Sequence, residues 1–247
     1  MTKSRCICSY SVDMTEYARL FTYAPLSAST CAVIGCVSPE PVSLLIPRRD
    51  PEGRAVVAIG DRAFAGCATL RTVTLPDSVE TVGTRAFAFC SNLLDIRLSP
   101  ESRLSSIGDR AFMGCERLTT LRFGSLSRLT ALGRSAFAHC THLRSVALPV
   151  GVRELAPSLF EGCTSLEHIR LPEGLTVLRT GAFAACSALG SIVLPSTLTA
   201  IEDCAFAWCG HLTDLYLPDG PCMISATAFK ECAELGDPLR LVTLEAV

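Results

Sequence analysis

The sequence is poor in charged residues and in long apolar runs, and each shortage excludes a class of protein. Charged residues make up 19% of the 247 residues and the net charge is −2, so no overall field attracts nucleic acid or an anionic membrane. The longest uncharged stretch near the start, residues 20–39, is interrupted by Pro25 and several Ser and Thr. That stretch is too polar for a membrane span. Because the net charge is close to zero, we also expect no nucleic-acid partner.

Motifs of catalysis are also missing. The chain has no G-x-S-x-G, no phosphate-binding glycine loop and no H-E-x-x-H, and its carboxylates are scattered without a repeated facing pair. We therefore predict no catalytic residue, no cofactor and no enzymatic activity.

What the sequence has in abundance is a repeat, A-F-x-x-C-x-x-L-x-x-I-x-L-P, whose Phe, Cys and Leu positions recur in eight units at steps of 23 or 25 residues. The repeated phenylalanines are Phe64, Phe87, Phe112, Phe137, Phe160, Phe183, Phe206 and Phe229. A cysteine follows each phenylalanine after three residues and a leucine after six. This period and leucine spacing are typical of a leucine-rich repeat solenoid, whose units share one continuous core.

Each unit has three parts. The first is L-x-x-I-G, and the second is the A-F-x-x-C turn, whose length favours a single helical or 3₁₀ turn. The third alternates apolar and polar residues, as in Thr72-Val73-Thr74-Leu75, which predicts a strand with one buried face. Stacked units place these strands side by side in parallel, and a proline often ends the strand.

The N-terminal segment, residues 1–42, carries no repeat and has two interpretations. It is either a cap that shields the first unit, as solenoids require, or a signal segment in which Val33-Ile34-Gly35-Cys36 acts as a lipobox. Membrane contact follows only in the second case, through a lipidated Cys36. Residues 43–59 resemble a degenerate first unit, with a charged and solvated loop at Arg48–Arg54.

The C-terminal segment, residues 236–247, departs from the repeat. Gly236-Asp237-Pro238 replaces the expected strand, and residues 239–244 then predict a capping strand. An uncovered strand edge is a template for association, so this edge also supports a second hypothesis. In that hypothesis the chain is a self-associating structural protein of the cell envelope. The repeats themselves occupy residues 43–235.

The repeat resembles that of the BspA-like bacterial leucine-rich repeat proteins, most closely at Ile107-Gly108-Asp109-Arg110-Ala111-Phe112-Met113-Gly114-Cys115. The resemblance covers about residues 55–235. It implies an α/β repeat solenoid with a concave parallel β-sheet, and with short strands and helical or 3₁₀ turns on the convex side. It also implies a binding role, often adhesin-like and at the cell surface. No convincing secretion signal or anchor is visible, so a cytoplasmic location stays open.

The repeated cysteine has a structural interpretation. Zinc sites need converging pairs of ligands, usually C-x₂₋₄-C, and no such pair occurs at the repeat positions. We expect small buried side chains whose thiols bond a turn carbonyl, and no metal site. His139 and His142 look like ligands but are expected at the surface. Cys204 and Cys222 stand outside the repeat register and are candidates for exposed thiols or for a disulfide.

The outward positions of the predicted strands form the candidate partner surface. The residues chosen there are Arg97, Arg122, His168, Arg170 and Tyr216. Arg and Tyr are enriched at protein-binding hot spots, which favours a non-enzymatic module that holds a protein or peptide ligand. The opposing hypothesis is a solvated sheet face, in which Arg97 and Arg170 pair with neighbours such as Asp95 and Glu167.

Overall fold

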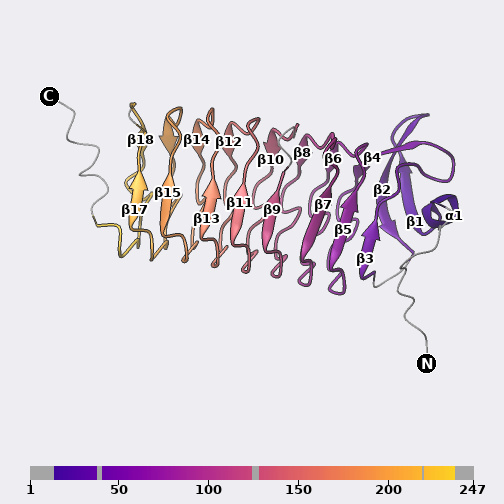
Figure 1. Cartoon of the computed structure of the whole chain (residues 1–247), viewed down its shortest axis with the longest axis horizontal. Helices are drawn as coiled ribbons and strands as arrows, with labels where there is room; N and C mark the ends of the chain where they lie inside the picture. The colour runs from indigo at the N-terminus through magenta and orange to yellow at the C-terminus, as the bar shows by residue number, and fades with distance from the viewer. Residues whose placement is uncertain (1–13, 38–40, 124–127, 219, 237–247) are drawn as a thin grey trace.

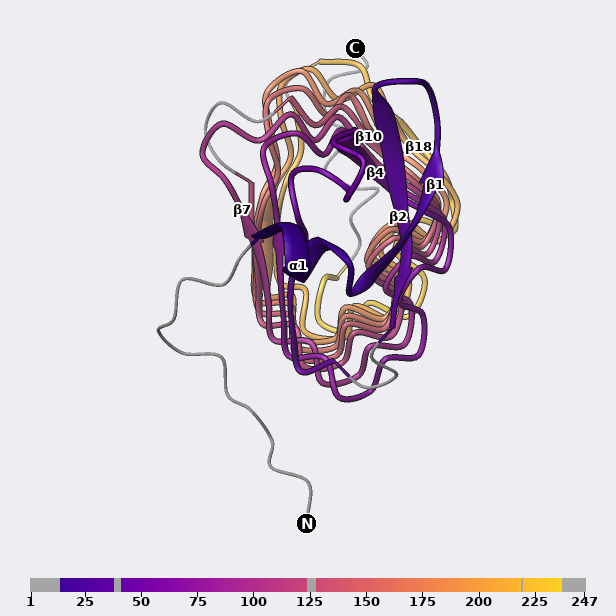
Figure 2. The same cartoon turned by 90° about the vertical axis from the view of Figure 1, so that its right-hand side faces the viewer.

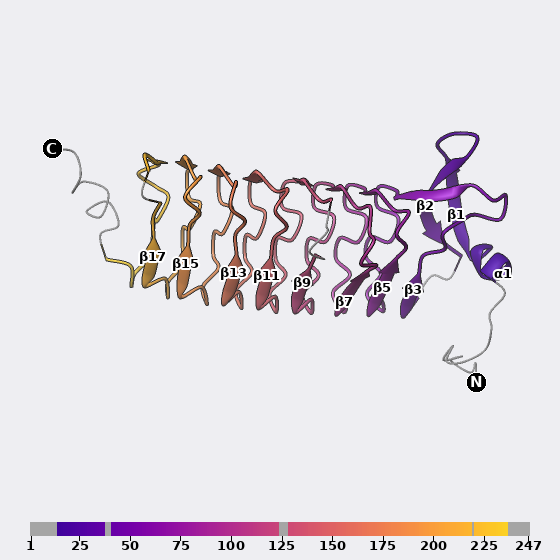
Figure 3. The ribbon, with the colours of Figure 1, turned by 45° about the horizontal axis from the view of Figure 1, so that its top comes forward.

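The repeats fold into one stack of coils, whose strands follow one another in two rows (Figure 1). Within each row the strands pair in parallel, with breaks that divide the first row into three sheets and the second into two. The computed structural model describes residues 14–37, 41–123, 128–218 and 220–236. We number the coils by their phenylalanines, from coil 1 with Phe64 to coil 8 with Phe229. The stack is nearly straight (Figure 3), so the expected concavity of the sheet is slight.

Two sets of strands alternate along the chain. The first set, which we call the long sheet, consists of β3 (Ser43–Leu45), β5 (Thr72–Leu75), β7 (Asp95–Leu98), β9 (Thr120–Arg122), β11 (Ser145–Ala147), β13 (His168–Arg170), β15 (Ser191–Val193) and β17 (Asp214–Tyr216). The second set, the short sheet, consists of β4 (Ala55–Ile59), β6 (Thr81–Val82), β8 (Ser106–Ile107), β10 (Ala131–Leu132), β12 (Glu154–Leu155), β14 (Val177–Leu178), β16 (Ala200–Ile201) and β18 (Met223–Ile224).

The N-terminal end of the stack is covered by a hairpin. Helix α1 (Met14–Ala18) leads into β1 (Phe21–Pro25), which pairs antiparallel with β2 (Thr30–Cys36), and β2 pairs parallel with β4. Figure 2 shows this hairpin and α1 in front of the first coils. Cys31 and Val33 of β2 are fully buried and belong to the core, while Cys36 is half-buried at the strand's end.

The core is a column of stacked rings, as the repeat predicted. Neighbouring phenylalanine rings lie nearly parallel, with centroids 5.2 Å apart between Phe87 and Phe112 and 5.8 Å apart between Phe137 and Phe160. The first seven rings are buried, and Phe229 at the end of the stack is half-buried. Leucine, isoleucine and valine side chains from both sheets surround the column.

The A-F-x-x-C turns are not helical, which corrects the expectation of helical or 3₁₀ turns on the convex side. Apart from α1, the described residues contain no helix. In coil 2, Arg85 and Phe89 have φ angles of 54° and 61°, so a left-handed residue stands before and after the phenylalanine. Such residues interrupt a right-handed helix. Alternate amides instead bond the next coil, as in Phe64 N to Ala86 O at 2.8 Å.

The C-terminal end of the stack carries no described cap. Strands β17 and β18 are the last members of their sheets among the described residues. The predicted capping strand, residues 239–244, lies outside the described part of the chain. The lipobox hypothesis concerns a segment that begins at Met14, and its tetrapeptide Val33-Ile34-Gly35-Cys36 lies at the end of β2.

Candidate binding surface

The long sheet holds all five predicted partner-binding residues on its outward face. Along a strand, successive side chains point to opposite faces, so the residues flanking a buried central position point outward together. The parallel register places Ala147 of β11 between Arg122 of β9 and Arg170 of β13. His168 lies beside Ser145 in the same register. Arg122, His168 and Arg170 therefore share one three-stranded piece of sheet.

Arg97 and Tyr216 lie on separate pieces. The hydrogen-bonded ladder of the long sheet is divided into β3-β5-β7, β9-β11-β13 and β15-β17. Arg97 is on β7, at the edge of the first piece, and Tyr216 is on β17, opposite Val193. Figure 3 shows these strands following one another in a row, so the two residues extend the central group in opposite directions.

The electrostatics of the arginines differ from one another. Arg97 donates from Nε to Oδ2 of Asp95 at 2.8 Å, as the solvated-face hypothesis expected for this residue. Arg122 and Arg170 are exposed and make no ion pair with any described residue, and Glu167 does not pair with Arg170. Two unneutralised guanidinium groups thus flank the small side chains of Ser145 and Ala147.

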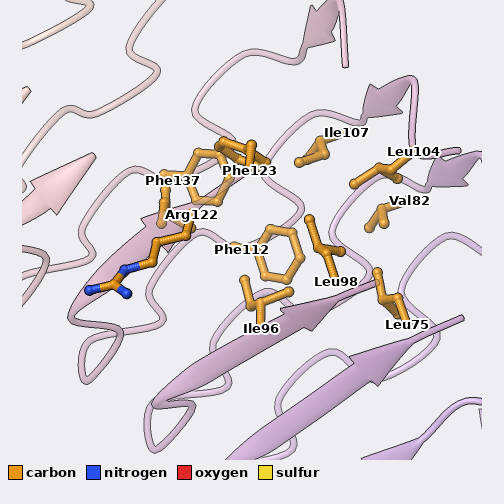
Figure 4. A pocket seen from close by; sticks show the side chains of 11 residues that line it. Leu75, Val82, Ile96, Leu98, Leu104, Ile107, Phe112, Arg122, Phe123 and Phe137 are labelled. Atoms are coloured by element: carbon orange, nitrogen blue, oxygen red, sulfur yellow. The ribbon is translucent and has the colours of Figure 1, made fainter. Parts of the chain in front are cut away.

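A narrow apolar pocket opens beside Arg122, at the break between β7 and β9 (Figure 4). Half-buried Ile96, Leu98 and Phe123 line it, and the guanidinium of Arg122 points away from them. The pocket encloses about 10 Å³, room for about one water, whereas small-molecule sites span hundreds of Å³. The pocket is therefore a packing defect beneath the surface and not a cofactor site.

The cysteine column has the structural role that its spacing predicted. The thiol of Cys140 donates to the carbonyl of Phe112 at 3.4 Å, and the thiol of Cys163 donates to that of Phe137 at 3.2 Å. Burial raises the pKa of Cys163 to about 12 and that of Cys140 well above its usual range. Because the thiolate is the reactive form, these side chains are poor nucleophiles and poor metal ligands. Cys204 and Cys222 are half-buried free thiols.

The histidines do not form a metal site. Nδ1 of His142 lies 2.9 Å from the carbonyl oxygen of Glu116, and Nδ1 of His211 lies 3.0 Å from Oε1 of Glu234. Among the described residues, no group of three or more His, Cys, Asp or Glu is placed to hold a metal ion. No described helix has the length and apolar character needed to cross a bilayer.

Sequence reasoning missed a second exposed surface, on the A-F-x-x-C turns. Phe89 and Trp208 stand two positions after their coils' phenylalanines and are 56% and 51% exposed. The repeat has no fixed residue at that position, so the pattern drew no attention to it. A tabulation of that position alone, coil by coil, would have found both aromatic residues.

The comparisons with known proteins agree with this geometry. The family model described as "BspA type Leucine rich repeat region" matches residues 53–127 and 106–236, in six copies. No curated protein matches the chain.

Several solved structures are similar to this chain. A leucine-rich cell surface protein of Faecalibacterium prausnitzii A2-165 is 30% identical with a TM-score of 0.73, over 79% of this chain and 52% of its own. The chain thus spans about half the length of that protein. A leucine-rich repeat protein of T. pallidum is 27% identical with a TM-score of 0.63, over 91% of this chain and 92% of its own. A leucine-rich repeat protein of Bacteroides ovatus, 24% identical, has a TM-score of 0.53 over 87% of this chain and 68% of its own, and shows the fold alone.

Proposed function

The chain belongs to the family of BspA-type leucine-rich repeat proteins, and we propose on that basis that it is a non-enzymatic binding module. It holds a protein or peptide partner on the outward face of the long sheet. Leucine-rich repeats present extended surfaces for such contacts. The cell-surface description of the Faecalibacterium protein supports a surface location and an adhesin-like role for this chain.

One observation carries the choice of surface. Arg122 and Arg170 stand on either side of Ala147 with no ion pair to any described residue. Because neighbouring strands are ~4.8 Å apart, the two guanidinium groups start from positions roughly 10 Å apart on one piece of sheet. A guanidinium group binds a carboxylate with two parallel hydrogen bonds. The partner is therefore an acidic segment that lies across β9, β11 and β13.

The remaining candidate residues extend this surface. His168 lies on the same strand as Arg170, and Tyr216 offers an exposed ring toward the C-terminal end. Arg97 contributes less charge, since Asp95 already neutralises it. The self-association hypothesis based on the C-terminal strand concerns residues outside the described part of the chain.

Charge reversal tests the surface directly. A labelled poly-glutamate peptide serves as the probe, with binding followed by fluorescence anisotropy. We expect the variant Arg122→Glu, Arg170→Glu to bind at least tenfold more weakly, because each lost charged hydrogen bond costs about 1.5–3 kcal/mol. The thermal melt should stay unchanged, because both side chains are exposed and unpaired within the described chain.

The matched control is Arg117→Glu, another exposed arginine with no described ion pair, on a turn outside the long sheet. This variant should bind the probe like the parent chain. Unchanged binding by the double variant would reject the surface, and equal binding of a poly-lysine peptide would reject the acidic partner.

A further inference from the structure

The A-F-x-x-C turns of successive coils follow one another in a row along the stack. We call it the turn ridge and define it by the residues two positions before and two positions after each phenylalanine. The later set is Gly66, Phe89, Gly114, His139, Gly162, Ala185, Trp208 and Glu231. The earlier set is Arg62, Arg85, Arg110, Ser135, Ser158, Gly181, Cys204 and Thr227.

The rings of Phe89 and His139 lie close against the backbone of the next coil. A Cβ at Gly114 would come within 2.7 Å of the Phe89 ring, and one at Gly162 would come within 2.5 Å of the His139 ring. Both glycines also have left-handed φ angles, of 72° and 71°. The ring of Trp208 leans the same way, with Nζ of Lys230 6.0 Å from its centroid. One face of the Phe89 ring is therefore packed on backbone, and more than half of its surface stays open to solvent.

The position of the two exposed aromatic residues is symmetric. Phe89 belongs to coil 2 and Trp208 to coil 7, and these coils are equally far from the middle of the eight-coil stack. A two-fold axis through the ridge between coils 4 and 5 would bring each Phe89 against the Trp208 of a second copy. The same operation places the small residues Gly114 of coil 3 and Ala185 of coil 6 opposite one another, and brings the two His139 side chains near the axis.

The two halves of the stack carry opposite net charge, as an antiparallel pairing of two copies requires. Residues 53–150 contain twelve Arg and seven Asp or Glu, whereas residues 151–236 contain four Arg or Lys and ten Asp or Glu. The Debye length is about 8 Å at physiological salt, so over a stack with 5.2–5.8 Å steps the two halves act as separate charges. On the ridge, Arg62, Arg85 and Arg110 follow one another in the basic half.

We propose that this chain forms an antiparallel homodimer through the turn ridge, with Phe89 and Trp208 as the reciprocal anchors. Antiparallel packing sets each basic half against the acidic half of the other copy, whereas parallel packing would set like charges together. An interface in which the same patch faces itself in two copies is the commonest kind in homo-oligomers. The dimer does not depend on the proposed partner, since it leaves the long sheet uncovered.

Sedimentation velocity measures the association. A narrow ridge makes a small interface, so we expect dimers at about 10–100 µM protein and their loss at roughly 0.5 M salt. The variant Phe89→Asp, Trp208→Asp should remain monomeric throughout. The matched control is Val150→Asp, which changes a 71% exposed apolar residue outside the ridge and should dimerise like the parent chain. A parent chain that stays monomeric at these concentrations, or a double variant that dimerises, would overturn the proposal.

Cysteine cross-linking tests the register. In a Cys204→Ser background, the pair Phe89→Cys and Trp208→Cys should give a covalent dimer under mild oxidation. Either substitution alone should not, because each new thiol then faces the partner's aromatic ring. A covalent dimer from Phe89→Cys alone would show that the two copies pack in another register, and would reject the antiparallel arrangement.

Discussion

The stacked phenylalanines are the side chains on which the stability of the fold most depends. Each ring from Phe87 to Phe206 contacts the rings of both neighbouring coils, so the loss of one such ring leaves a void that three coils share. The surrounding leucines are held by short strands and cannot move far into that void. Close-packed interiors respond to such voids with a loss of stability that grows with the volume of the cavity.

We expect Phe137→Ala to lower the free energy of unfolding by about 3–5 kcal/mol, because Phe137 is fully buried between two stacked rings. The matched variant is Phe229→Ala, at a half-buried ring that stacks on one neighbour only. It should cost clearly less. Urea unfolding of both variants and the parent chain gives the comparison. Equal losses at the two positions would contradict a core centred on the ring column.

At the scale of elements, the loop between β3 and β4 is more ordered than its composition indicated. It was expected to be solvated, but Asp50 within it is buried. The carboxylate of Asp50 accepts hydrogen bonds from Nε of Arg54 at 2.6 Å and from the amide of Arg54 at 2.8 Å. Burial by itself would raise the pKa of Asp50, but the bonds from Arg54 outweigh burial and hold that pKa below its usual range.

This loop should make the N-terminal end of the stack sensitive to acid. A carboxyl group whose pKa is lowered by folding stabilises the protein above its unfolded pKa, and that stability is lost as the pH falls through the folded pKa. We expect Asp50→Asn to destabilise the protein at neutral pH, with a difference from the parent chain that shrinks below about pH 4. Unfolding measured at both pH values checks this. A difference that is constant with pH would mean that the ion pair contributes nothing.

The strands could be predicted from the sequence because their signal is local. Alternating residues such as those of Thr72–Leu75 specify a half-buried strand without reference to other coils. The turns could not be predicted in the same way. Arg85 and Phe89 are not residues that favour left-handed φ angles, and the hydrogen bonds that hold them there come from the next coil.

The position of the candidate surface could be predicted from the sequence, but the ion pairs of its arginines could not. Because the repeat fixes the register, the sequence alone placed Arg122 and Arg170 in one column on the sheet. Whether each arginine pairs with a nearby carboxylate depends on side-chain conformation, and the outcomes differ. Arg97 forms an ion pair with Asp95, whereas Arg170 and Glu167 do not form one. The long sheet is divided between β7 and β9 and again between β13 and β15. Only the first division lies beside the 25-residue steps, so spacing by itself does not predict the second.

At the scale of the whole molecule, the two ends of the stack differ in cover. Coil 1 is closed by the hairpin of β1 and β2, and its Phe64 is only 2% exposed. In coil 8, Phe229 and Leu235 are half-buried, and β18 has no described strand beyond it. In a solenoid each coil is stabilised mainly by its neighbours, so an end with less cover opens more often.

Amide hydrogen exchange should therefore show a gradient along the stack. We expect slow exchange for the inter-coil amides of the middle coils, such as Phe137 N, which bonds Leu159 O at 3.0 Å. Exchange should be faster for coil 8 than for coil 1, because among the described residues only coil 1 has a covering hairpin. The measurement belongs on the Phe89→Asp, Trp208→Asp variant, so that association through the ridge does not protect either end. If coil 1 exchanged as fast as coil 8, the hairpin would not act as a cap, and stability would be uniform along the stack.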